Sequence, residues 1–143
     1  MADAGRGADP GAALIHPLPP DADPWRDTAE TGPGGALWGV LDCARDRSLY
    51  PEIEALDEDA ICLFRQVKPE VIRAAPHLVR LREGSRLLER WRSEGWGAAW
   101  GMLFRSEADR DTLFRELRRH MDVELPDGRR VLYRFWDPRV GML

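Results

Sequence analysis

Lysine is almost absent from this chain of 143 residues: Lys68 is the only one, and arginine supplies the other 20 of the 21 basic residues. Acidic residues number 25, which gives a formal net charge of −4 and a pI near 5.4. This acidic balance disfavours a general nucleic-acid or membrane binder. Because Asp and Glu are interleaved with the arginines, we attribute the arginine excess to codon preference rather than to an anion-binding surface.

Cysteine and long hydrophobic runs are also scarce. Cys43 and Cys62 are the only cysteines, and they lie in or beside apolar runs without C-x-x-C spacing, so we expect buried, reduced thiols. No apolar run approaches the ~20 residues that a membrane-spanning helix needs. The N-terminus lacks a basic region followed by an apolar core, which is typical of secretory signals. These absences predict a cytoplasmic protein.

Histidine is equally sparse, and its spacing argues against a metal site. His16, His77 and His120 lie far apart, and none belongs to an H-x-x-x-H or H-E-x-x-H motif. The chain has no G-x-S-x-G motif, and the glycines of G-W-G-A-A-W-G precede a predicted strand. In phosphate-binding loops the glycines follow a strand and open a helix. We therefore expect no metal, no cofactor and no catalytic residues.

The stretch over residues 95–106, G-W-G-A-A-W-G-M-L-F-R-S, is the element around which we expect the fold to be organised. A strand that is apolar on both faces lies centrally in a sheet and needs packing layers on each side. We expect Gly95 to end the preceding helix in a left-handed conformation. The second half alternates between two apolar faces, formed by Trp100, Met102 and Phe104 and by Ala99, Gly101 and Leu103.

Further apolar runs and helix-start signals alternate along the chain. We predict strands over 36–42, 60–65 and 77–82, helices beginning near Tyr50, Pro69 and Ser85, a long helix over 107–120 opened by Ser106 and Asp109, and a hairpin turning at 126–128. The fold class is therefore α/β: a mixed sheet of about five or six strands with helices packed on its faces, ending in a β-hairpin.

The N-terminal segment has a different composition. Residues 1–35 are rich in Gly, Ala, Pro and Asp, and four prolines between positions 17 and 24 oppose regular structure. Such a segment buries too little apolar area to offset its ordering entropy. We predict a disordered arm over 1–35, with Leu14, Ile15 and Trp25 as the residues best suited to dock on the domain or on a partner. The ordered domain then spans 36–143.

Two groups of charged residues suggest alternative functions. Asp42, Asp137 and Arg139 or Arg134 are expected at one end of the sheet, either as a hydrolytic or phosphate site or as a structural ion pair, and we favour the ion pair. A basic patch would favour nucleic acid, but interleaved acids dilute it and no aromatic ladder accompanies it, so we expect no nucleic-acid partner. That patch comprises Arg110, Arg115, Arg118, Arg119, Arg129 and Arg130.

Several segments, taken together and in order, resemble a known family, the bacterial type VI secretion effector chaperones, also called effector adaptors. The resemblance covers about 36–143. It is carried by L-W-G-V-L-D-C-A-R-D-R-S-L-Y-P (37–51), C-L-F-R (62–65), A-A-P-H-L-V-R-L (74–81), G-W-G-A-A-W-G-M-L-F-R-S (95–106) and R-V-L-Y-R-F-W-D-P-R-V (130–140).

This resemblance implies a non-enzymatic cytoplasmic protein that binds a toxin effector and helps load it onto a VgrG-type spike. Family members generally continue past D-P-R-V into a second lobe, so 36–143 is expected to be a first lobe, truncated before the second. We expect partner contacts at Tyr50, Trp96, Arg134, Asp137 and Arg139, which lie at predicted strand or helix ends. The alternative is a small metal-dependent hydrolase or nuclease that uses the acidic cluster at the sheet end.

Overall fold

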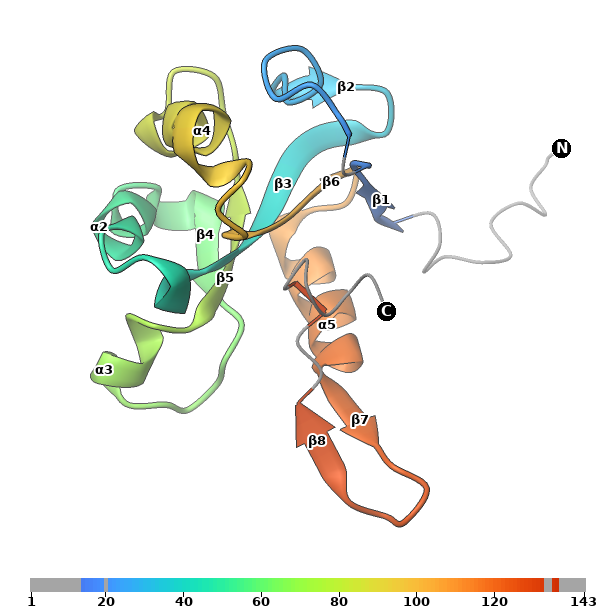
Figure 1. Cartoon of the computed structure of the whole chain (residues 1–143). Helices are drawn as coiled ribbons and strands as arrows, with labels where there is room; N and C mark the ends of the chain where they lie inside the picture. Colours follow the sequence, from blue (N-terminus) through green and yellow to red (C-terminus); the bar gives the residue numbers. More distant parts are fainter. Residues whose placement is uncertain (1–13, 20, 133–134, 137–143) are drawn as a thin grey trace, which may run out of the picture.

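The computed structural model of the chain describes residues 14–19, 21–132 and 135–136. These residues form a six-stranded sheet, a separate two-stranded hairpin and four helices (Figure 1). The predicted α/β class, with helices on the faces of one sheet and a terminal hairpin, is confirmed. The sheet that we expected to be mixed is antiparallel in every pairing of the described residues.

The strand β3 (Gly35–Asp42) lies in the middle of the sheet. It is flanked by β6 (Gly101–Ser106) and β5 (Pro76–Arg80), and the short strand β2 (Thr31–Gly32) pairs with its start. The strand predicted to be central, β6, is therefore the second-ranked interior strand. The full order is β1 (His16–Pro17), β6, β3, β5 and β4 (Ala60–Cys62).

Side chains of β3 alternate between two hydrophobic cores, one on each face of the sheet. Leu37 and Leu41 face the layer of α2 (Leu49–Glu54) and α4 (Arg86–Arg90), whereas Trp38 and Val40 face α5 (Arg110–Met121). Figure 1 shows α2 and α4 on one side of the sheet and α5 on the other. Two buried faces explain why the central strands are apolar at consecutive positions, as predicted.

The segment that leads into β6 differs from the prediction at Gly95. The helix α4 continues as a π-helical turn (Trp91–Gly95), and Gly95 is not left-handed; the left-handed residue of the segment is Ala99, with φ of 56°. Gly95 is needed for another reason. A Cβ there would lie 2.5 Å from the Trp100 ring, so the missing side chain lets that ring pack against the turn.

The N-terminal segment is a second correction. Residues 14–35 were expected to be part of a disordered arm, yet in the described part of this segment β1 pairs with β6 and β2 pairs with β3. Ala22 and Thr28 are buried. Backbone hydrogen bonds and polar side chains hold the segment, which explains why hydrophobic composition alone misplaced the start of order.

The long helix and the hairpin complete the described chain. The predicted helix over 107–120 is α5 (Arg110–Met121), and its cap is Asp109, whose carboxylate accepts from the Thr112 amide at 2.8 Å. The strands β7 (Asp122–Glu124) and β8 (Arg130–Leu132) follow directly. Figure 1 shows this hairpin extending past the end of α5, away from the sheet. The remaining helix, α3 (Pro69–Ile72), begins at the predicted proline.

Candidate partner-binding surface

A hollow of about 690 Å³ opens between a 3-10 turn, η2 (Cys43–Arg45), and the helices α2 and α3. Its charged residues are exposed and carry both signs, whereas Cys43 is buried and Tyr50 is half-buried. A less polar centre within a charged rim is the usual composition of a protein-binding patch. The lining residues are Cys43, Ala44, Tyr50, Pro51 and Ala74, with Arg47, Arg73, Glu54 and Glu70 as the charged set.

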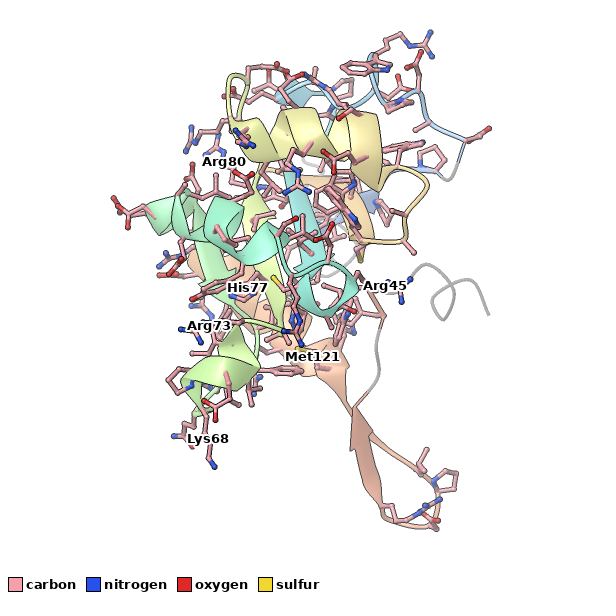
Figure 2. All side chains as sticks on the ribbon, turned by 60° about the vertical axis from the view of Figure 1, so that its left-hand side comes forward. Arg45, Lys68, Arg73, His77, Arg80 and Met121 are labelled. Carbon is pink, nitrogen blue, oxygen red and sulfur yellow. The ribbon has the colours of Figure 1, made fainter. Side chains whose placement is uncertain are left out.

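The inner wall of this hollow rests on a buried histidine. The Tyr50 ring meets the His77 ring nearly edge-on, with 5.8 Å between the ring centroids. His77 is 3% exposed, and its Nδ1 donates to the Ala75 carbonyl oxygen at 3.0 Å, with the Cys43 sulfur 3.6 Å away. Figure 2 shows His77 inside the body, whereas Lys68 points away from it beyond α3. Tyr50 is therefore positioned from below by a fixed imidazole.

The thiol and imidazole of this pair are both in their neutral forms at neutral pH. Burial lowers the pKa of His77. Burial, with a smaller contribution from the negative charge of Asp42, raises the pKa of Cys43 to about 12. Catalysis by a Cys–His pair needs a thiolate, and this environment favours the opposite protonation state. The pair packs beneath the hollow and supplies no activated nucleophile.

Burial of His77 predicts a pH dependence of stability. The unfolded chain takes up a proton near pH 6.5, whereas the folded chain takes it up only at lower pH, so stability is lost as the pH falls below about 6.5. The free energy of unfolding should decrease by up to about 1.4 kcal/mol per pH unit in that range. Urea unfolding between pH 7.5 and 5.0 measures it. His77→Asn should flatten this contribution, and His16→Asn, at an exposed site, should retain it; an unchanged slope in His77→Asn would contradict the assignment.

Two of the five residues predicted to contact a partner lie on the same side of the sheet. Tyr50 lines the hollow, and Trp96 packs half-buried against the same hydrophobic core as α2 and α4, outside the hollow. The other three, Arg134, Asp137 and Arg139, lie outside the described residues. The structure therefore places Tyr50 in a surface hollow and gives Trp96 a packing role.

The carboxylate of Asp42, a candidate for the alternative hydrolytic site, caps a turn. Its Oδ1 accepts from the Ala44 amide at 3.0 Å, and the Asp42 amide donates to the Trp100 carbonyl oxygen at 2.7 Å. Asp42 is 3% exposed. The proposed partners Asp137 and Arg139 lie outside the described residues, so the pairing of Asp42 with them stays a prediction.

A second hollow, of about 410 Å³, has several acidic residues in its wall, but those with known contacts serve the fold. Asp59 is bound bidentately by Arg82, and Asp109 caps α5. Among the residues that the structure describes, no three His, Cys, Asp or Glu side chains are placed to hold a metal ion. The acids of this hollow are Glu58, Asp59, Glu107 and Asp109.

Most of the arginines considered as a basic patch are engaged in contacts. Arg119 pairs with Glu116 at 2.8 Å, and Arg129 pairs with a neighbouring aspartate at the same distance. Arg110 and Arg118 donate to backbone carbonyl oxygens. Interleaved acids thus dilute the positive charge, as the sequence analysis expected. Within the described residues, every helix is too short or too polar to cross a bilayer.

The sequence analysis missed how firmly the N-terminal segment is attached. Arg105, only 6% exposed, donates to the carbonyl oxygens of Asp27 at 2.8 Å and Gly35 at 3.3 Å. Trp25 is 60% exposed and lies against the guanidinium of Arg92, 6.0 Å from the ring centroid. An arginine in an otherwise apolar strand was the available signal, because a buried guanidinium needs acceptors from another segment.

Comparison with known proteins identifies the family of the ordered body. A family described as "Domain of unknown function (DUF4123)" matches residues 37–143, from β3 to the end of the chain. No curated protein and no solved structure matches the chain. Because the match covers most of the sequence and includes both cores and the hollow beside Tyr50, the chain belongs to the DUF4123 family.

Proposed function

We propose that this protein is an effector chaperone, or adaptor, of bacterial type VI secretion: it binds a toxin effector and helps load it onto a VgrG-type spike. The observation that carries the proposal is its membership of the DUF4123 family over residues 37–143. The ordered series of segments that resembles effector chaperones supports it. In this proposal the protein acts in the cytoplasm by binding alone, transforms no substrate and needs no cofactor.

The hollow between η2, α2 and α3 supports a protein-binding role. Its rim offers two arginines and two glutamates, so a partner segment of complementary charge pattern can be oriented at the site. Such complementarity governs specificity and association rate more than affinity. Tyr50 provides an aromatic anchor, the kind of residue that commonly dominates binding energy at interfaces.

Reversal of one rim charge tests the hollow without disturbing the core. Arg73 is exposed, so Arg73→Glu should leave the free energy of unfolding within about 0.5 kcal/mol of wild type. It should weaken toxin binding by about 1 kcal/mol or more, roughly tenfold in Kd, because a rim cation becomes an anion. Calorimetry with the purified toxin that the wild-type protein captures from its host measures both quantities.

A matched control is available on the other side of the sheet. Arg115 is an exposed arginine of α5, and Arg115→Glu makes the same charge change away from the hollow. Equal affinities in the two variants would remove the hollow from the contact surface. Trp96→Ala is a weaker test, because Trp96 packs against the core and its truncation is expected to reduce stability as well as binding.

A further inference from the structure

The outer edge of β6 is covered by a strand that is short and exposed. The strand β1 is two residues long, and both of its residues, His16 and Pro17, are exposed. They pair with Arg105 and Phe104 of β6, and Figure 1 shows β1 beside β6 at this edge of the sheet. A two-residue strand contributes little stability of its own.

The sequence of β1 also limits its pairing. Pro17, opposite Phe104, has no amide hydrogen to donate, and Pro19 follows one residue later. Between them, the Leu18 amide donates to the Leu103 carbonyl oxygen at 3.0 Å. An extended segment without prolines could offer β6 donors at positions where β1 has none. The present cover is therefore a weak competitor for the edge.

The rest of the N-terminal segment is held independently of β1. The Leu37 amide donates to the Glu30 carbonyl oxygen at 3.0 Å, and the Glu83 amide donates to the Glu30 carboxylate at 2.7 Å. Arg92 donates to the Thr28 carbonyl oxygen, and Arg105 to that of Asp27. Residues 27–35 can thus stay in place while residues 14–19 leave the edge.

The edge of β6 also offers apolar contacts on both faces of the sheet. Ile15 packs against the core that includes α5, and Leu18 packs against the core of α2 and α4. An occupant of this edge therefore needs apolar side chains that point to opposite faces, as in an extended strand. This requirement adds side-chain selectivity to the backbone pairing.

We propose that the outer edge of β6 is an acceptor site for an extended segment of a partner protein, and that β1 holds the place of that segment. The segment that fits is free of proline over at least three residues and carries apolar side chains at the places of Ile15 and Leu18. Binding then adds a strand to the sheet, with backbone hydrogen bonds for affinity and the two apolar places for selectivity. The site deepens the proposed function and rests on it only for the identity of the partner.

A peptide exchange experiment on the full chain tests this site. The probe is a fluorescent synthetic peptide of residues 11–22 in which valine replaces Pro17, Pro19 and Pro20. In the protein, Leu18→Pro removes the amide that bonds to Leu103 and loosens β1, whereas Pro17→Val strengthens it. Fluorescence anisotropy should show at least tenfold tighter peptide binding to Leu18→Pro than to wild type, because the tethered competitor is weakened. Pro17→Val should bind at least tenfold more weakly.

Each other outcome overturns the proposal. Equal peptide affinity in the three proteins would place the peptide elsewhere, and self-association of Leu18→Pro without peptide binding would assign the edge to a second copy of the chain. If Leu18→Pro fails to fold, the comparison of wild type with Pro17→Val decides alone, and equal affinities contradict the site. Uptake of the peptide by a protein that binds no toxin would overturn the proposed function and leave the edge site standing.

Discussion

Gly101→Ala is expected to destabilise the folded protein by about 3 kcal/mol, the upper end of the usual cost of overpacking. A Cβ at this position would overlap the Val40 carbonyl oxygen, far inside the 3.0 Å below which real Cβ contacts are essentially unknown. The neighbour is the backbone of β3, which is paired on both sides by β5 and β6 and cannot retreat. Relief therefore requires separation of the two central strands.

Gly97→Ala is the matched control for this substitution. It makes the same chemical change four residues earlier, where a Cβ would meet no atom within 4 Å and the residue is exposed. Its effect should stay within about 0.5 kcal/mol. Urea unfolding of the two variants gives both values, and a similar small loss in each would refute the close approach of β6 to β3.

Trp100→Ala is expected to cost about 3–5 kcal/mol, the usual range for truncation of a buried tryptophan. Trp100 is 3% exposed and meets the Trp91 ring edge-on with 5.9 Å between centroids. The Arg90 guanidinium lies over the Trp100 ring at 5.3 Å. Thermal and urea unfolding measure the loss; a cost below about 1 kcal/mol would contradict this packing.

A double-mutant cycle with Gly95 separates this packing from general damage. Gly95→Ala alone should cost about 1–3 kcal/mol, because the new Cβ would lie 2.5 Å from the Trp100 ring. In the Trp100→Ala background the ring is gone, so the same substitution should be nearly neutral. Simple additivity of the two losses would show that the two residues do not touch.

The elements of the fold could be predicted because their residues carry local signals. Alternation of apolar side chains on both faces marked β3 and β6, and proline followed by glutamate marked the starts of α2 and α3. These signals depend on a few neighbouring residues only. The order of strands depends on pairing between distant segments, which is why β3 rather than β6 proved to be the middle strand.

The candidate site could be predicted only in part. Tyr50 was expected near a surface from its place at a helix start, and the structure places it in the wall of a hollow. The support from His77 and Cys43 could not be foreseen, because those residues are 34 positions apart and meet through strand register. The attachment of residues 27–35 depends on Arg105 and backbone carbonyls, which a hydrophobic pattern does not report.

Toxin delivery by the native host tests the proposed adaptor role most directly. Removal of this protein should abolish secretion of one toxin through the type VI apparatus while other toxins are still exported, and the wild-type chain should restore it. Unchanged secretion of every toxin would contradict the adaptor role, and loss of all type VI secretion would indicate a structural component instead.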